Sequence, residues 1–319
     1  MRYDELSSPV HWLECGGFLV SSQLFLDVIF TEACNRSCPF CIAKTVQRFP
    51  ENIKKWKQSL HRAFELFSIQ SIIILGGEAT IDSHFWEKLE LTAKIARSHG
   101  TDRIILTTNG TMLAKPDFLD RLCASEIDSV NLSRMHYDQE INDRLFGGNT
   151  PTREEIRNIF RCLHAAGKSL RINVNIWRGN LDSPEEMDRF VQAFSGACDA
   201  VKFSPLMDTE MFGTIAQVQE FTAQHSIPDA QIRALYDTWS ARHRVVSRRA
   251  NVLGYVDYAQ VRSGEQLVIL KYAQVEDKYD RNRVIPTLKL YPNGCLSNEW
   301  SSEKSILDHF PEKETGNLR

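Results

Sequence analysis

The sequence predicts an α/β fold, a partial (β/α)6 barrel of the TIM type followed by a small β-rich appendage. Two observations lead to this prediction. Between residues 23 and 206, short β-branched runs alternate with amphipathic stretches, which is typical of βα units around a parallel sheet. Six such units follow one another, and because each crossover is right-handed they curl into an open or closed barrel more readily than into a flat sheet.

Six short runs rich in strand-forming residues are the expected strands of the barrel. They are Leu24–Thr31, Ser71–Leu75, Arg103–Thr108, Ser129–Ser133, Leu170–Ile176 and Ala200–Ser204. Helices lie between them. Thr150-Pro151 and Ser183-Pro184 each offer an N-cap hydroxyl followed by proline at the first helical position. We expect the carboxyl ends of the strands to meet at one rim, where the loops of such barrels carry the active site.

The pattern changes after Pro205, where a helix over Asp229–His243 precedes several runs that we expect to be antiparallel strands. These runs lie near Asn251–Tyr258, Gln266–Val275, Val284–Tyr291 and Cys295–Trp300. Asn293-Gly294 predicts a hairpin turn, because these residues accept positive φ angles. We therefore divide the chain into an N-terminal extension (1–22), a barrel (23–206) and an α+β appendage (207–319) that packs on the barrel and contributes to the substrate site.

Composition and charge argue against several classes of function. The chain has 319 residues and a formal net charge of -3, which provides no basic field for a stable nucleic-acid partner. No apolar stretch approaches the length of a membrane span, and the first residues lack the pattern of a signal peptide. Only three of the eight cysteines are clustered, unlike a secreted disulfide framework. We expect a cytoplasmic protein without membrane attachment.

The clustered cysteines, Cys34, Cys38 and Cys41, follow the first strand with C-x3-C-x2-C spacing. Three thiolates on one short loop suit an iron–sulfur cubane and leave its fourth iron open to another ligand. The alternative is a structural zinc site, which needs a fourth protein ligand. Cys15 is the first candidate for that ligand and His61 the second.

The spacing, with Phe40 directly before the last cysteine, resembles the defining motif of the radical S-adenosylmethionine (SAM) superfamily. The resemblance covers about residues 23–206. It implies a [4Fe-4S] cluster on the three cysteines and SAM on the open iron. It also implies that one electron, from a donor such as flavodoxin or ferredoxin, cleaves SAM to methionine and a 5′-deoxyadenosyl radical that abstracts a substrate hydrogen.

The second and third strands end in motifs that agree with this resemblance. Gly76-Gly77-Glu78 resembles the family's GGE motif and would bind the SAM amino group, although Ala79 replaces the usual proline. Glycine also allows the backbone to approach a ligand closely, whereas a Gly-Gly pair after a strand is often only a turn. Thr108 and Asn109 resemble the family's TNG segment, with a helix cap and turn as the alternative for Asn109.

The fourth and fifth strands end in further polar groups. By resemblance to molybdopterin-cyclase-like members, Ser133 would hydrogen-bond the SAM carboxylate and Arg144 would neutralise it, unless Arg144 is a solvated helix residue. Asn173 and Asn175 share one strand face under the period of two. Facing the barrel, they would need partners, which the ribose hydroxyls of SAM would supply.

Substrate contacts are expected from later strands and from the appendage. By position, the candidates that could face a substrate are Arg134, His136, Tyr137, Lys202 and Ser204. Cys295 is the one cysteine after residue 198, so local ligands for an auxiliary cluster are missing. One hypothesis is that its thiol returns a hydrogen atom to a substrate radical, and the alternative is a small buried core residue.

Three hypotheses about function follow. The first is a radical SAM enzyme that abstracts hydrogen from a small polar metabolite of the nucleoside, nucleotide or sugar type. The second keeps this chemistry on a ribosomal peptide, which the lack of auxiliary cysteines disfavours. The third, from a different class, is a noncatalytic zinc-binding or interaction protein.

Overall fold

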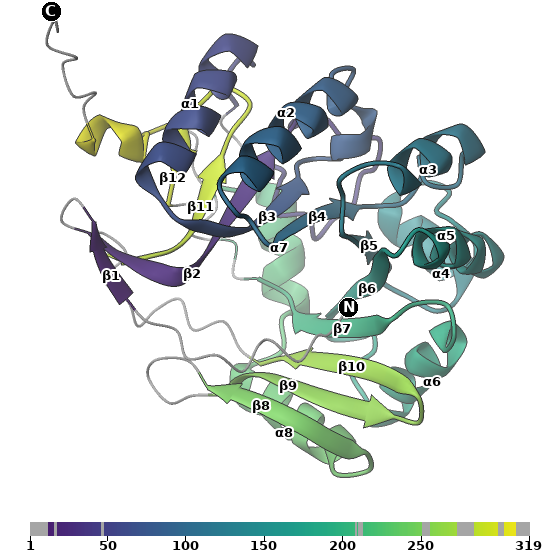
Figure 1. Cartoon of the computed structure of the whole chain (residues 1–319). Helices are drawn as coiled ribbons and strands as arrows, with labels where there is room; N and C mark the ends of the chain where they lie inside the picture. Colours follow the sequence, from purple (N-terminus) through teal and green to yellow (C-terminus); the bar gives the residue numbers. More distant parts are fainter. Residues whose placement is uncertain are drawn as a thin grey trace, which may run out of the picture.

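The computed structural model describes residues 12–15, 18–45, 48–207, 209, 213–250, 256–272, 284–298 and 303–310. It confirms the predicted fold class, an open barrel of parallel strands surrounded by helices (Figure 1). The six predicted barrel strands are β2 (Phe18–Ile29), β3 (Ile69–Leu75), β4 (Arg103–Thr108), β5 (Ser129–Ser133), β6 (Ser169–Ile176) and β7 (Ala200–Pro205). They pair in this order, and each is parallel to the next.

Helices cover the outer face of these strands. They are α1 (Ile53–Leu66), α2 (Phe85–Ser98), α3 (Pro116–Cys123), α4 (Gln139–Phe146), α5 (Arg153–Ala165) and α6 (Pro184–Phe194). Ser183 caps α6 with Pro184 at its first position, as predicted. The prediction of a cap at Thr150 was wrong: Thr152 caps α5 in a reciprocal capping box with Glu155, which satisfies two backbone N–H groups rather than one.

The C-terminal part continues the barrel sheet at both of its edges. It contains α7 (Ala216–His225), α8 (Asp229–Ser240), β8 (Arg244–Ala250), β9 (Val256–Ser263), β10 (Gln266–Lys271), β11 (Val284–Leu290), β12 (Leu296–Ser297) and the 3-10 helix η5 (Ile306–His309). The sheet order is β12-β11-β2-β3-β4-β5-β6-β7-β10-β9-β8, and β1 (Trp12–Cys15) pairs with β2. Among the described residues, no helix is long and apolar enough to cross a membrane.

The expectation of antiparallel strands in this part needs a correction. β10 is antiparallel to β9, and β11 to β12, but β10 is parallel to β7 and β11 is parallel to β2. Hairpin signals in a sequence report only the antiparallel neighbour, so the parallel pairings carried no local mark. The turn at Gly294, with φ of +82°, joins β11 to β12 as predicted. Residues 251–255, 273–275 and 299–300 of the predicted strands lie outside the described residues.

Alternation along each strand separates an apolar outer face from a more polar inner face. On β2, Leu26 and Val28 are fully buried in the main core, which also contains Trp56 of α1 and Phe85 of α2. Asp27 lies between them in sequence and therefore points to the inner face. The helices thus pack against one side of the sheet and leave the other side to form the barrel interior.

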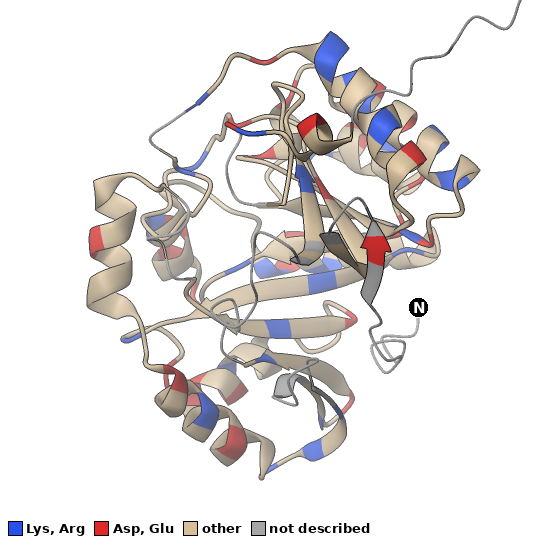
Figure 2. Ribbon diagram, turned by 90° about the vertical axis from the view of Figure 1, so that its left-hand side faces the viewer, with Lys and Arg blue, Asp and Glu red and all other residues tan. Residues whose placement is uncertain are grey.

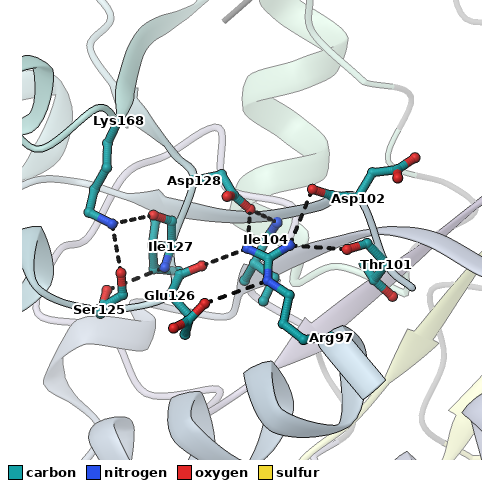
Figure 3. Close-up of polar contacts among 9 residues, drawn as sticks. All are labelled: Arg97, Thr101, Asp102, Ile104, Ser125, Glu126, Ile127, Asp128 and Lys168. Atoms are coloured by element: carbon teal, nitrogen blue, oxygen red, sulfur yellow. Dashed lines mark hydrogen bonds and ion pairs between the residues drawn. The ribbon is translucent and has the colours of Figure 1, made fainter. Parts of the chain in front are cut away.

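A polar network joins α2 to the connections at the amino ends of β4 and β5, on the side of the barrel opposite the cysteine loop (Figure 3). Arg97 of α2 donates to Asp128 Oδ2 at 2.8 Å and to the Thr101 carbonyl at 3.0 Å. The same Asp128 oxygen accepts the Ile104 N–H at 2.6 Å. Lys168 donates to two further carbonyl oxygens of the β4–β5 connection. One carboxylate therefore ties α2 to the start of β4.

Asp128→Ala is expected to destabilise the fold without affecting chemistry at the other rim. It leaves the Ile104 N–H and the Arg97 guanidinium without their acceptor, which costs about 2–4 kcal/mol for buried or charged groups. Urea unfolding measures this change. The exposed Asp102 contributes only its backbone oxygen to the network, so Asp102→Ala is the control and should stay close to the parent protein. Equal stability of the two variants would contradict the assignment.

Candidate active site

The three clustered cysteines lie on the loop that follows β2, at the carboxyl ends of the barrel strands. Cys34 is exposed, Cys41 is half-buried and Cys38 is buried, and all three thiols are free. Burial raises the pKa of each thiol, that of Cys38 to about 12, and the neighbouring cysteines raise the pKa of Cys34 and Cys38 further. Bound metal reverses this, because it stabilises thiolates. Three free thiols on one loop fit a cluster with one open iron.

The zinc alternative needs a fourth protein ligand, for which His61 and Cys15 are the candidates from the sequence. His61 lies on the exposed face of α1, and Cys15 is the last residue of β1. Across the described ranges, no three Cys, His, Asp or Glu side chains stand close enough together to hold a single metal ion. The ligands of a four-iron cluster do not require so close a grouping.

Gly76 and Gly77 are needed because the cysteine loop packs directly on them. A Cβ on Gly76 would lie 2.3 Å from the Thr31 oxygen, and one on Gly77 would lie 2.3 Å from the Ala33 oxygen. The Gly77 N–H donates to the Thr31 carbonyl at 2.8 Å. The close neighbour of both glycines in this structure is the cysteine loop, and their predicted approach to a ligand stays a prediction.

Glu78 is 2% exposed and turns into the protein, where it joins the loops after β3 and β4. Its Oε1 accepts the Thr108 and Thr80 hydroxyls, each at 2.6 Å, and its Oε2 accepts the Asn109 N–H at 2.7 Å. Burial raises the pKa of Glu78, while these hydrogen bonds favour the carboxylate. The side chain is a brace that sets the position of neighbouring backbone groups.

The TNG segment contacts the cysteine loop from the other side. Asn109 donates from Nδ2 to Asn35 Oδ1 at 2.8 Å, and Asn35 donates to Thr111 Oγ1 at 2.9 Å. Thr108 is 2% exposed and its hydroxyl is engaged with Glu78. The two predicted motifs thus form one polar network with the residue directly after Cys34.

The end of α4 holds the middle of the cysteine loop. The Ser37 N–H donates to the Phe146 carbonyl at 2.9 Å, and Arg36 donates to the Asn149 carbonyl. Gly147 has φ of +70°, and a Cβ there would lie 1.9 Å from Ser37 Oγ. A side chain at Gly147 is therefore disfavoured by the backbone conformation and would also displace the Ser37 side chain of the cysteine loop.

Gly147→Ala is expected to displace the cysteine loop and lower both iron retention and SAM affinity, the latter about tenfold. Gly167→Ala is the matched control, because Gly167 has φ of +73° but nothing lies within 4 Å of its Cβ position. Both variants carry a backbone penalty of about 1–2 kcal/mol. Iron content and SAM titration separate them, and a Gly167→Ala protein that loses as much iron would contradict the proposed contact.

The strand register brings the later predicted residues together on the inner face. Ser133, Asn173 and Lys202 are partners across β5, β6 and β7 and form one row. Asn175 and Ser204 form the next row toward the carboxyl ends. All five are partly exposed while their strand neighbours are buried, as expected for side chains on the inner face.

Other predicted residues lie elsewhere. Arg134 is 1% exposed, and its guanidinium donates to the Pro151 and His136 carbonyls, each at 2.8 Å. The Tyr137 hydroxyl donates to Glu186 on the outer helix α6. His136 is buried, and its Nδ1 accepts the N–H of Asp138. These three side chains organise the β5–α4 connection.

The two remaining candidates differ in their surroundings. Arg144 is exposed on α4, as the alternative of a solvated helix residue expects, and its side chain forms no hydrogen bond or ion pair with the residues that the structure describes. Cys295 is 3% exposed, packs with Ile29 and Tyr291, and directs its thiol to the Lys304 carbonyl at 3.2 Å. Arg144 is thus available to a ligand, whereas the Cys295 thiol already has an acceptor.

An aromatic cluster around Cys38 was not expected from the sequence. Phe40 lies 5.1 Å from Trp177, between ring centroids, and 6.2 Å from Phe146 and from Phe221. Phe221 comes from α7, which is attached to the cysteine loop where the Ile215 N–H donates to the Lys44 carbonyl. The motif contains Phe40, but only the docking of α7 reveals its partners.

Comparisons with known proteins agree with this geometry. A GTP 3′,8-cyclase from Haemophilus ducreyi is 26% identical over 283 residues, which are 86% of this chain and 77% of that enzyme. The mycofactocin maturase MftC from Mycolicibacterium smegmatis is 24% identical over 176 residues, 55% of this chain and 43% of the maturase. The structure of SuiB from Streptococcus suis bound to precursor peptide SuiA superposes with a TM-score of 0.61 at 16% identity.

The SuiB match covers 92% of this chain and 65% of SuiB, so this chain spans less than two thirds of that protein, and at such identity the match shows the fold. The family model for the radical SAM superfamily matches residues 28–193, which include the cysteine loop and the strands from β3 to β6. The chain therefore belongs to the radical SAM superfamily, whose enzymes use a [4Fe-4S] cluster and SAM.

Proposed function

We propose that this enzyme cleaves SAM reductively and uses the resulting 5′-deoxyadenosyl radical to abstract hydrogen from a small polar metabolite of the nucleoside, nucleotide or sugar type. The observation that carries the proposal is the row of Ser133, Asn173 and Lys202 on the inner face, at the same end of the barrel as the cysteine loop. When bound, the cluster and SAM supply the electron and the radical. The chain positions both reactants and excludes water.

The chain's own residues would hold the cofactors as follows. Cys34, Cys38 and Cys41 would ligate the cluster, and backbone groups beside the Glu78 brace would receive the SAM amino group. Ser133 and the available Arg144 would bind the SAM carboxylate, a charge-assisted contact. The ribose would lie against the asparagines of β6. An external donor such as flavodoxin or ferredoxin would supply the electron.

Charge in the barrel interior favours a substrate with an anionic group. Burial lowers the pKa of Lys202 well below its ordinary value, and the positive charges of Arg171 and Lys271 lower it further. Charged residues of both signs are spread over the outer helices (Figure 2), and the net charge is -3, so these cations are a local feature. A phosphate or carboxylate would relieve their repulsion. The GTP 3′,8-cyclase relatives, named for a nucleotide substrate, support the same class.

The test begins with anaerobic reconstitution of the full chain. We expect about four irons per chain and release of 5′-deoxyadenosine after reduction, whereas bound zinc without SAM cleavage would refute the enzyme. The next step adds nucleotides and sugar phosphates in one series and precursor peptide SuiA in another. Stimulation of 5′-deoxyadenosine release by a phosphorylated metabolite supports the proposal. Stimulation by the peptide alone would refute a small-metabolite substrate and identify the enzyme as one that modifies peptides.

A further inference from the structure

A carboxylate on β2 faces the barrel interior, opposite in sign to the cations of β6, β7 and β10. Asp27 lies two residues before the end of β2, between Leu26 and Val28, whose side chains enter the main core. Its strand partners are Ile73 on β3 and Lys289 on β11. Asp27 therefore stands on the inner face, beneath the start of the cysteine loop.

Asp27 has no hydrogen-bond donor among the residues that the structure describes. It is 7% exposed, and it forms no ion pair within 4.0 Å in that part of the chain. Glu78, a carboxylate that is 2% exposed, accepts from two hydroxyls and two backbone N–H groups. Buried acceptors are normally paired, so the contrast marks Asp27 as a group whose partner is a ligand.

The charged and titratable groups around Asp27 do not satisfy it. Lys289 donates to Thr287 Oγ1 at 3.0 Å and to the Asn298 carbonyl at 3.3 Å, and it acts on Asp27 only through its charge. The phenol of Tyr291 and the carboxylate of Glu32 lie in the same region. Burial raises the pKa of Asp27 to about 6, against the opposing effect of Lys289. At neutral pH the group is therefore largely ionised, and its carboxylate lines the barrel interior without a donor from the described residues.

We propose that Asp27 binds an N–H donor of the substrate, either an amine or the N–H edge of a base, inside the barrel. The substrate would then be bipolar, with its donor end at β2 and its anionic end near Arg171 and Lys202. This inference rests on the proposed function, because it requires a substrate in the interior. It adds the orientation of the substrate and a residue that determines specificity.

Matched ligand pairs test the assignment in the reconstituted protein with SAM. GTP is compared with ITP, which lacks the 2-amino group, and glucosamine 6-phosphate with 2-deoxyglucose 6-phosphate, which lacks the amine. Equilibrium dialysis is expected to show at least one donor-bearing member binding about tenfold or more tightly than its partner, because a buried acceptor rejects an analogue that leaves it unpaired. Asp27→Ala should remove this preference and leave affinity for the partner unchanged.

Two further variants complete the test. Asp27→Asn keeps the shape and one acceptor oxygen, so it should retain part of the preference for a neutral N–H and lose that for a charged amine. Asp102→Asn, on the exposed surface at the other end of the barrel, should match the parent protein. A preference that survives in Asp27→Ala, equal loss for both members of a pair, or no binding of any donor-bearing member would overturn the inference. SAM cleavage on reduction still reports the proposed function separately.

Stability against pH provides a readout that needs no substrate. Because the folded pKa of Asp27 is raised, the folded state binds the proton more tightly than the unfolded state, and its stability falls as pH rises from about 4 to about 6. Asp27→Asn removes this loss. Its midpoint of thermal unfolding should exceed that of the parent protein more at pH 8 than at pH 4. A difference that does not change with pH would show that folding leaves the pKa of Asp27 unshifted, and a smaller difference at pH 8 than at pH 4 would show that its carboxylate is already paired; either result would contradict the inference.

Discussion

Replacing Cys38 with serine is expected to abolish reductive SAM cleavage while leaving the fold intact. Cys38 is the most buried of the three clustered thiols, and a serine hydroxyl is a hard, poorly ionised ligand for iron. Loss of even an outer partner of a metal site costs about 10–100-fold in metal affinity or activity, so loss of a direct ligand should exceed about 100-fold. Iron content after reconstitution and 5′-deoxyadenosine release measure the effect.

Cys123→Ser is the matched control. Cys123 is a free, half-buried thiol at the end of α3, remote in sequence from the cysteine loop. This variant should retain full iron content and SAM cleavage. Comparable iron loss in the two variants would show that thiol removal affects folding in general, and retention of both iron and cleavage by Cys38→Ser would remove Cys38 from the cluster.

The second large effect is expected at Glu78. In Glu78→Gln, the new amide nitrogen must face a donor, because the hydroxyls of Thr80 and Thr108 and the Asn109 N–H all donate to the present carboxylate. Leaving buried, charge-assisted hydrogen bonds unmade costs about 2–4 kcal/mol. The loops after β3 and β4 should separate, and SAM affinity should fall about 10–100-fold, as for partners that orient ligand groups.

Urea unfolding of the metal-free protein and SAM titration of the reconstituted protein measure these two consequences. Glu87→Gln is the control, because Glu87 is an exposed helix residue whose ion pair with Lys57 lies in solvent. It should leave both quantities unchanged. SAM affinity that survives a clear loss of stability in Glu78→Gln would mean that the brace supports the fold alone and not the cofactor loops.

The barrel could be predicted in detail because its signals are local. β-branched runs, turn residues and the right-handed rule located β2 to β7 to within a few residues, apart from the early start of β2 at Phe18. The pairings of β10 with β7 and of β11 with β2 could not be predicted, because an apolar alternating strand has the same pattern whether its neighbour is parallel or antiparallel. The N-cap of α5 is Thr152 rather than the predicted Thr150, because Thr152 and Glu155 each accept a backbone N–H from the other.

In the candidate site, too, the features that depend on local sequence could be predicted, and those that depend on contacts between distant segments could not. The row of Ser133, Asn173 and Lys202 follows from a period of two, which the sequence displays. The inward turn of Glu78 does not, because it depends on donors supplied by a different loop. Asp27 was overlooked for a related reason. The sequence of one apolar strand does not show whether the neighbouring strands offer a hydrogen-bond or ion-pair partner to its one charged residue.

The pairing of β11 with β2 has a consequence for how the chain folds. Leu26 lies beside Leu288, so β2 pairs with a parallel neighbour that follows it only after all the other strands of the barrel. Contacts so distant in sequence slow folding, because a long loop must close before they form. Until then β2 presents an unpaired edge that other chains are able to join. Early folding must therefore proceed from the middle of the barrel outward, and chaperones that shield strand edges should raise the yield of the complete protein more than that of a stable small domain.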